Sequence, residues 1–231
     1  MKGKQALKKA FIRWSEKVPQ PRFTMLKNLK LFQWVNEHGA EKRILNLGAG
    51  DGRFDHYLGK HVKTVNLDID LSKEGMEVIA DAHCLPFKNE SFDMVYSIAV
   101  MEHVRKPWIV ASEISRILRA GGHVAVELPF LNVIHDKEDY FRFTDKGIRS
   151  LFEEDAFEVV LEQVGSGGGS FLSVFLLIYL EQFVPTKVLK ALWRLLMGHL
   201  FSLLKHLDSL VPSSDLERLT ANSFSFVLRK K

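Results

Sequence analysis

The alternation of strand-like and helix-like segments is the feature that most constrains how this chain can fold. Short apolar runs typical of strands occur at residues 43–48, 62–69, 76–80, 91–99 and 123–129. Residues 52–60 and 107–118 have helical patterns, and the Ala-Gly-Gly of residues 120–122 predicts the end of the second helix. Strands separated by helices favour a parallel sheet covered on both faces. The sequence therefore predicts the doubly wound α/β class.

A glycine-rich turn follows the first of these strands. Gly48, Gly50 and Gly52 fall within five positions, directly after the apolar run. In open α/β sheets the ligand lies outside the carboxyl ends of the strands, and a turn without β-carbons lets the backbone approach it. The dinucleotide fingerprint has the spacing GxGxxG, but Arg53 stands where its third glycine would fall. This spacing disfavours a nicotinamide cofactor.

The residues that follow suggest a different nucleoside ligand. Asp68 ends the second strand about twenty residues after the first glycine, where a carboxylate can accept both hydroxyls of a ribose. Further on, the chain reads Asp-Ala-x-x-Leu-Pro-Phe at residues 81–87, Ser-Phe-Asp-x-Val at 91–95, Glu-His-Val at 102–104 and Gly-Gly at 121–122. With the glycine turn and the acidic second strand, these six elements resemble the small-molecule branch of the class I S-adenosylmethionine-dependent methyltransferases. The resemblance extends from Ile44 to about Pro129.

The resemblance implies a methionine-binding turn for the cofactor S-adenosylmethionine. Its residues would be Gly48, Ala49, Gly50 and Gly52. The family usually has an acidic residue two positions before the first glycine, where this chain has Asn46. Asparagine keeps a hydrogen-bonding oxygen but lacks the charge that would attract the ammonium group of the cofactor.

The resemblance also implies contacts for the rest of the cofactor. Asp68 would hold the ribose and Ile69 would pack on the adenine ring. The Asp81 carboxylate would meet the exocyclic amine, and the Ala82 amide would face a ring nitrogen. Ser97, at the end of the fourth strand, would lie near the sulfonium.

Acid–base groups gather after the fifth strand, in residues 129–144. They are His135, Asp136, Asp139, Tyr140 and Arg142. This segment is similar to an H-x-x-x-D-Y-x-R-x-T loop of some class I methyltransferases, and it would supply a base, carboxylates that orient it and an anion clamp. In the structural alternative, the arginine pairs with a neighbouring carboxylate and the aromatic residues pack the loop down. His103 is a second candidate base, or it caps a helix beside the site.

Cysteine content and charge limit the cellular setting. Cys84 is the only cysteine, so neither an internal disulfide nor a cysteine-based metal site can form, and we expect a cytoplasmic protein without a metal. Residues 1–30 contain nine Lys or Arg residues and a single acidic residue, although the whole chain has a net charge of only +4. Residues 1–40 are predicted to form a basic helical extension, and residues 41–231 the methyltransferase domain. A basic arm suits an anionic membrane surface, a nucleic acid or a solvated helix face.

The last third of the chain adds a helical insert at residues 170–214. It follows a sixth predicted strand (156–165) and a Ser-Gly-Gly-Gly-Ser stretch that predicts a flexible hinge. The alternating segment 222–231 would be the family's seventh strand, antiparallel beside the sixth. Polar residues recur about every four positions on the otherwise apolar helix at 187–210. Neither apolar segment is a convincing transmembrane helix, so the insert would form a lid, a dimer interface or a membrane-surface contact.

These observations predict an S-adenosylmethionine-dependent methyltransferase. We expect the acceptor to be a small molecule, or one linked to a lipid or polysaccharide, methylated on oxygen. The fourth strand lacks the Asn/Asp-Pro-Pro-aromatic tetrapeptide of base methylases, which makes a nucleic-acid acceptor the weaker alternative. A catalytically silent protein of the same fold is the other alternative, with Asn46 as a sign of decay.

Overall fold

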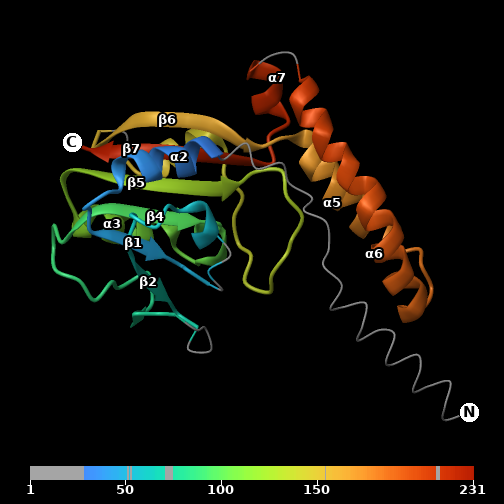
Figure 1. Cartoon of the computed structure of the whole chain (residues 1–231), viewed down its shortest axis with the longest axis horizontal. Helices are drawn as coiled ribbons and strands as arrows, with labels where there is room; N and C mark the ends of the chain where they lie inside the picture. The colour runs from blue at the N-terminus through green and yellow to red at the C-terminus, as the bar shows by residue number, and fades with distance from the viewer. Residues whose placement is uncertain (1–28, 51, 53, 71–74, 154, 212–213) are drawn as a thin grey trace, which may run out of the picture. The chain divides into compact units, whose positions relative to one another are not determined.

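The computed structural model describes residues 29–231 except 51, 53, 71–74, 154 and 212–213 (Figure 1). The basic helix expected in residues 1–28 lies outside the described residues. The chain divides into two compact units. Among the described residues, we call 29–130, 134–165 and 223–231 the sheet unit, and 131–133 and 166–222 the helical unit.

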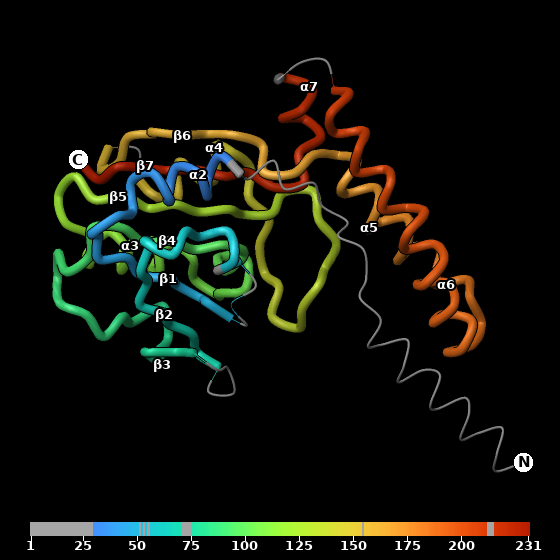
Figure 2. The backbone as a smooth tube through the Cα atoms, in the orientation of Figure 1, coloured from blue at the N-terminus to red at the C-terminus, as the bar shows by residue number. Residues whose placement is uncertain are grey.

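A seven-stranded sheet organises the sheet unit. Its strands are β1 (Ile44–Leu47), β2 (Thr64–Asp68), β3 (Val78–Ile79), β4 (Phe92–Ile98), β5 (Leu118–Pro129), β6 (Phe157–Ser166) and β7 (Ser223–Lys230). Their order across the sheet is β3-β2-β1-β4-β5-β7-β6 (Figure 2). The first five strands pair in parallel, and β7 pairs antiparallel with β5. The predicted doubly wound fold with an antiparallel last strand is confirmed.

Helix α2 (Leu29–His38) belongs to the core of the sheet unit. Its residues Leu31, Phe32 and Val35 are buried against Tyr96 and Ala125 of the central strands. Apolar residues spaced three and four apart lie on one helical face, which explains why this side of α2 is buried. Residues 29–38, assigned from sequence to the N-terminal extension, therefore pack as part of the sheet unit.

The remaining helices of the sheet unit connect the strands. They are η1 (Asp55–Tyr57), η2 (Met101–His103), α3 (Pro107–Ile117) and α4 (Asp145–Leu151). Of the predicted helix at 52–60, the described residues form only the short η1, since Gly52 has a left-handed backbone (φ +67°) and cannot extend the helix toward the turn.

The predicted helix stop at residues 120–122 is wrong in its position. Helix α3 ends at Ile117, because Leu118 is already extended and pairs with Phe92 of β4. The two glycines lie inside β5, where the pairing register with β4 shifts and Gly121 has a φ of +73°. Here glycine permits an irregular strand rather than ending a helix.

The helical unit contains the insert between β6 and β7. Its helices are α5 (Gly168–Glu181), α6 (Lys187–Phe201), η3 (Ser202–Leu210) and α7 (Ser214–Leu219). No helix in the described part of the chain is long and apolar enough to cross a membrane.

The predicted hinge at residues 166–170 is instead the packed start of α5. The buried Asp208 carboxylate accepts hydrogen bonds from the amides of Gly167, Gly169 and Ser170. A β-carbon at Gly169 would lie 2.3 Å from the carbonyl oxygen of Leu204. The glycines thus serve close packing, not flexibility.

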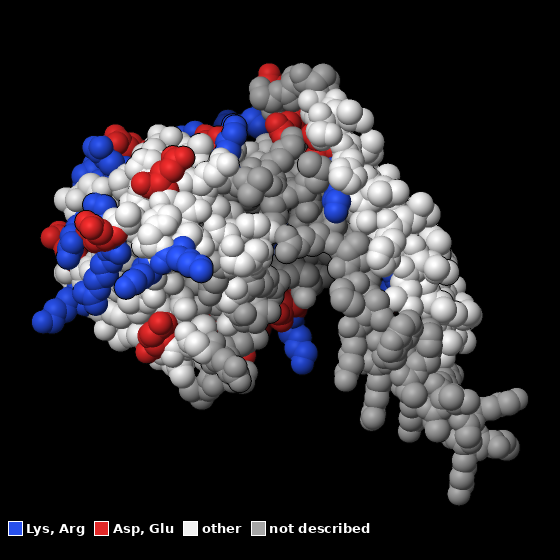
Figure 3. Space-filling view, in the orientation of Figure 1, with Lys and Arg blue, Asp and Glu red and all other residues white. Residues whose placement is uncertain are grey.

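Helix α6 and the following η3 expose leucines and bury small residues. Ala191, Gly198 and Ser202 are buried, and the Arg194 guanidinium binds the Glu181 carboxylate of α5 at 2.6 and 2.9 Å. The exposed large residues recur every three or four positions and are Leu189, Leu192, Leu196, Leu200, Leu203, Leu207 and Leu210. We call this row the leucine face. The described surface of α5 and α6 carries few charges in the space-filling view (Figure 3).

Candidate active site

A cleft of about 890 Å³ opens at the carboxyl ends of β1, β2 and β4. The glycine turn after β1, the end of β2, residues 80–83, the segment after β4 and part of the loop after β5 line it. Every lining residue belongs to the sheet unit. This is the edge of a parallel sheet where α/β proteins bind ligands.

The glycine turn brings bare backbone to the wall of the cleft. Gly48 has a φ of +71°, and its N–H donates to the Leu67 carbonyl oxygen at 2.8 Å. A β-carbon at Gly48 would lie 2.4 Å from Cγ2 of Val100. Glycine is required here for both the backbone conformation and the close approach.

Asp68 is held beside this turn by backbone amides. Its Oδ2 accepts from the Gly50 N–H at 2.8 Å and its Oδ1 from the Asp70 N–H at 3.0 Å. A carboxylate oxygen can accept more than one hydrogen bond, so both can also receive ligand hydroxyls. Ile69 lines the same wall with 67% of its surface exposed, which suits contact with a flat apolar ring.

Asp81 and Ala82 form the next part of the wall. The Asp81 Oδ1 accepts from the backbone N–H of His83 at 2.9 Å and contacts Nδ1 of its ring at 2.6 Å. The hydrogen bonds from His83 lower the pKa of the Asp81 carboxyl, so it is an anionic acceptor at neutral pH.

The segment that carries these residues is anchored by α3. Glu113 accepts from the Leu85 N–H at 2.7 Å, and Arg116 donates to the carbonyl oxygens of Leu85 and Phe87 at 2.9 and 2.8 Å. Glu113 and Arg116 also bind each other at 2.7 and 2.8 Å. The pair fixes the loop that follows Asp81.

Three of the residues assigned to the cofactor from sequence do not line the cleft. Ser97 is fully buried, and its hydroxyl donates to the Leu47 carbonyl oxygen at 3.1 Å. The Asn46 amide is also buried and donates to Oδ1 of Asn66 at 3.1 Å. Gly52 lies beyond the lining part of the turn. Ser97 still lies within β4, and the residues of this segment that line the cleft are Ile98, Ala99 and Val100, which follow it.

Glu102 is the residue of this region that the sequence did not single out. Its side chain is fully buried, and neither carboxylate oxygen has a hydrogen-bond partner among the described residues. Burial raises the pKa of this carboxyl to about 7. The Glu-His pair of residues 102–103 is visible in the sequence, but its burial depends on the tertiary fold.

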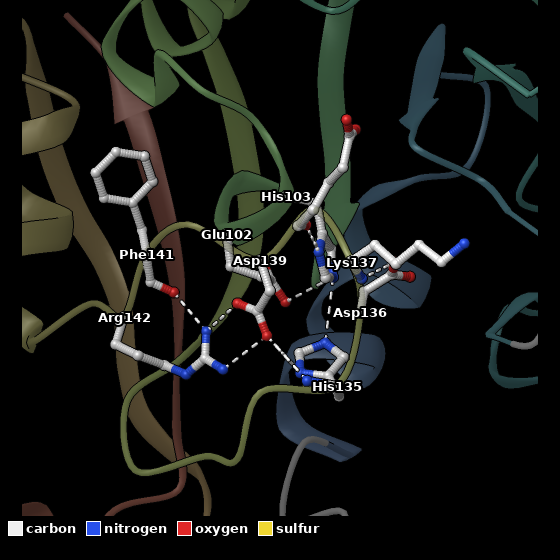
Figure 4. Close-up of polar contacts among 9 residues, drawn as sticks. Glu102, His103, His135, Asp136, Lys137, Asp139, Phe141 and Arg142 are labelled. Carbon is white, nitrogen blue, oxygen red and sulfur yellow. Dashed lines mark hydrogen bonds and ion pairs between the residues drawn. The ribbon is translucent and has the colours of Figure 1, made fainter.

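His103 and His135 meet at the same place (Figure 4). Their Nε2 atoms are 3.2 Å apart, and Nε2 of His103 is 3.7 Å from Oε1 of Glu102. Both histidines line the cleft. The structure therefore brings the two predicted bases together, although they are 32 residues apart in sequence.

Asp139 and Arg142 support this pair from outside the cleft lining, and Tyr140 also lies outside it. Asp139 contacts Nδ1 of His135 at 3.2 Å and also binds the Arg142 guanidinium through both oxygens (Figure 4). This pairing with Arg142 holds the pKa of the Asp139 carboxyl well below its usual range. The Tyr140 hydroxyl accepts from Arg105 at 3.2 Å. The arginine predicted to clamp a substrate anion is thus bound to a carboxylate of its own loop, as in the structural alternative.

Comparison with known proteins agrees with this geometry. A family model described as a methyltransferase domain matches residues 45–126. An uncharacterized methyltransferase of Mycobacterium leprae is 29% identical over 108 residues, which are 40% of each chain. The 27-O-demethylrifamycin SV methyltransferase of Amycolatopsis mediterranei is 28% identical over 147 residues, or 54% of each chain. The chain spans less than two thirds of the length of these relatives.

Solved structures support the fold. A Galdieria sulphuraria protein, provisionally assigned as a sarcosine dimethylglycine methyltransferase, aligns with a TM-score of 0.61 at 15% identity over 96% of this chain and 98% of that one. The match of strand order, glycine turn and acidic second strand agrees with the family model. Residues 45–126 therefore match a methyltransferase domain, and this match and the named relatives support the class I S-adenosylmethionine-dependent methyltransferase family, whose cofactor is S-adenosylmethionine.

Proposed function

We propose that this protein transfers a methyl group from S-adenosylmethionine to an acceptor bound in the same cleft. The observation that carries the proposal is the position of Asp68 beside the bare turn at Gly48 and Gly50, at the mouth of a cleft large enough for a nucleoside and a second ligand. Among the residues assigned from sequence, Gly48, Gly50 and Asp68 fit the cofactor best.

The fit extends to the base-binding part of the cleft. Ile69 presents an apolar surface, and Asp81 presents an anionic acceptor beside the Ala82 amide. These groups match the flat ring, the amine and the ring nitrogen of an adenine. Asn46 would act only indirectly, since its amide is bound to Asn66.

The cofactor supplies an activated methyl group, so the protein must mainly position the acceptor and manage its proton. His103 and His135 reach the cleft and can accept a proton from an acceptor hydroxyl. Oε1 of Glu102 lies 3.7 Å from Nε2 of His103. Asp139 and Arg142 would act by holding His135 in place.

We favour an oxygen acceptor on a small molecule, or on a lipid- or polysaccharide-linked one. Two histidines at the rim suit the removal of a hydroxyl proton, and the similar Amycolatopsis protein is named for methylation at an oxygen. Nucleic acid is the weaker alternative, because the support for it rests on the basic residues in positions 1–30 alone.

Calorimetric titration with S-adenosylhomocysteine tests the cofactor site. The full chain should bind with a micromolar Kd, and Asp68→Ala should weaken binding at least about tenfold because hydrogen bonds to a charged acceptor contribute about 1.5–3 kcal/mol. Asp155→Ala is the matched control, since this exposed aspartate lies outside the cleft. Absence of binding in a folded sample would overturn methyl transfer and favour the silent, scaffold-like alternative.

We also propose that the leucine face contacts a lipid surface, where a lipid-linked acceptor would be presented. Leu196, Leu200 and Leu203 are 64%, 53% and 60% exposed, an arrangement suited to the interface of a bilayer. Flotation with anionic liposomes should carry the full chain but not the triple Glu variant of these leucines. Equal flotation of both, or a concentration-dependent dimer that the triple variant abolishes, would contradict the lipid contact.

A further inference from the structure

We propose that Glu102, His103 and His135 form a binding site for a divalent transition-metal ion at the rim of the cleft. One ligand atom of each residue lies within 4.8 Å of the other two. The residues come from two segments, the short helix η2 and the loop after β5, which the fold brings together (Figure 4). The sequence alone predicts no metal: Glu102 and His103 are adjacent, but His135 is 32 residues from His103.

Two of the three separations between the ligand atoms fit coordination, and the third is within 4.8 Å. Two ligands that are each about 2.0–2.2 Å from an ion at a tetrahedral angle lie about 3.3–3.6 Å apart. The two Nε2 atoms are 3.2 Å apart, and Oε1 of Glu102 is 3.7 Å from Nε2 of His103. A small rotation of the side chains would place all three atoms around one ion.

The hydrogen bonds on the far side of each ring direct both lone pairs toward this point. Nδ1 of His103 contacts the Glu138 carbonyl oxygen at 2.5 Å, and Nδ1 of His135 contacts Oδ2 of Asp139 at 3.2 Å. Both partners only accept, so each Nδ1 carries a hydrogen, and Nε2 is the nitrogen of each ring that can offer a lone pair to a metal. Two lone pairs facing each other at 3.2 Å repel unless a cation lies between them.

Glu102 gives independent support. Its carboxylate is fully buried, and both oxygens are without a hydrogen-bond partner among the described residues. A buried carboxylate is costly unless a cation or donors satisfy it. A metal ion bound by both histidines would satisfy the carboxylate as well.

The residues behind the ligands resemble the second shell of a metal site. Histidines that bind metals usually donate their other N–H to a carbonyl or a carboxylate, as His103 and His135 do here. Asp139 is in turn fixed by Arg142. Asp139 and Arg142 thus act together to orient His135 as a ligand.

Two imidazoles and one carboxylate suit Zn²⁺, Mn²⁺, Fe²⁺ or Co²⁺ rather than Ca²⁺ or Mg²⁺. Three protein ligands leave coordination positions open, and His103 and His135 line the cleft. If the proposed methyl transfer holds, an acceptor oxygen would bind at an open position and lose its proton to solvent more readily, and the metal-bound histidines would then hold the ion rather than accept that proton. The existence of the site does not depend on that reaction.

Metal titration of the full chain tests the site. After chelator treatment, Co²⁺ should bind with one equivalent and give the visible absorption of a low-coordinate nitrogen–oxygen site, and Zn²⁺ should displace it. Glu102→Gln and His135→Ala should each weaken Co²⁺ binding at least about a hundredfold, and Asp139→Asn about tenfold or more. His206→Ala, which removes an exposed histidine of the helical unit, should bind like the parent.

The outcomes separate the site from the proposed function. The metal site would be overturned if the folded parent chain bound no Co²⁺. It would also be overturned if the Glu102→Gln and His135→Ala variants bound Co²⁺ as tightly as the parent. The contact between the two histidines would then be explained by a shared proton. Circular dichroism establishes that each variant is folded. S-adenosylhomocysteine titration of the metal-free chain reports on the cofactor site separately, so either proposal can fail while the other stands.

Discussion

The Asp208 carboxylate accepts a 2.6 Å hydrogen bond from the backbone amide of Gly169, across 39 residues of sequence. The same carboxylate accepts from the Ser170 hydroxyl at 2.6 Å. Together these bonds satisfy amides at the start of α5 that have no partner within the helix.

Replacing this cap should destabilise the helical unit. We expect Asp208→Ala to lower its free energy of unfolding by about 2 kcal/mol, because buried amides lose their acceptor. Thermal denaturation monitored by helical circular dichroism measures the change. Asp215→Ala, an exposed aspartate on α7, is the control and should melt like the parent. Identical melting of Asp208→Ala and the control would show that the cap does not stabilise α5.

Alanine substitutions at Gly48 and Gly50 of the glycine turn should differ in their effect on stability. Gly48→Ala adds a left-handed strain of about 1–2 kcal/mol and a clash with Val100, whereas Gly50→Ala adds a similar strain but its β-carbon would meet nothing closer than 4.0 Å. We therefore expect Gly48→Ala to be the more destabilising change by at least about 1 kcal/mol. Urea unfolding at equilibrium measures both variants. Equal losses would mean that the approach of Val100 does not restrict the turn.

Glu113 should make stability depend on pH in the acid range. The Arg116 guanidinium, followed by the Leu85 amide, lowers the pKa of the Glu113 carboxyl in the folded state. A lowered folded pKa contributes stability above the ordinary pKa of glutamate, and that stability is lost as the pH falls through the folded value.

The variant Glu113→Gln isolates this contribution. We expect it to unfold about 1–2 kcal/mol more easily than the parent at pH 7, with the difference shrinking as the pH falls toward 3. Urea unfolding at several pH values checks this trend. A difference that is constant with pH would show that the carboxylate charge contributes nothing.

Breaking the pair of Asp139 and Arg142 should be costly. The Asp139 side chain is only 1% exposed, so Arg142→Gln leaves a buried charge without its main partner, and we expect a loss of about 3 kcal/mol. Arg105→Gln is the matched control, because its guanidinium is exposed and its loss should not change the unfolding midpoint. Chemical denaturation measures the free energy of unfolding of both variants. A decrease of less than about 1 kcal/mol for Arg142→Gln would contradict a structural role for the pair.

The sequence predicts the sheet well, because the strands are buried and their apolar runs are local. The same is true of Gly48, Gly50 and Asp68, whose spacing reflects a single strand–turn–strand arrangement. Ser97 shows the limit of this approach: which residue of β4 reaches the cleft depends on where the strand ends against its neighbours.

The burial of Glu102 and the buried face of α6 could not be predicted from sequence for a related reason. The burial of Glu102 depends on the loop after β5, whose Tyr140 and Phe141 amides donate to the Glu102 carbonyl oxygen. In α6 and η3 the pattern of polar residues predicts a broad apolar surface but not its partner, and in the structure Gly198 and Ser202 are buried while leucines are exposed. Hydrophobic periodicity identifies a helix, but not which of its faces has a partner within the chain.

The place of β7 in the sheet has a consequence for how a nascent chain acquires its structure. Strand β7 lies between β5 and β6, and Val126 of β5 pairs with Phe226, about 100 residues later. Until the ribosome has released residues 223–230, β5 has an open edge and β6 has no neighbour to join, while the helices between β6 and β7 are already synthesised. Such long-range pairing slows folding, and an open edge can pair with other chains. The time between synthesis of β5 and arrival of β7 is therefore the period in which the edge of β5 is open to pairing with other chains.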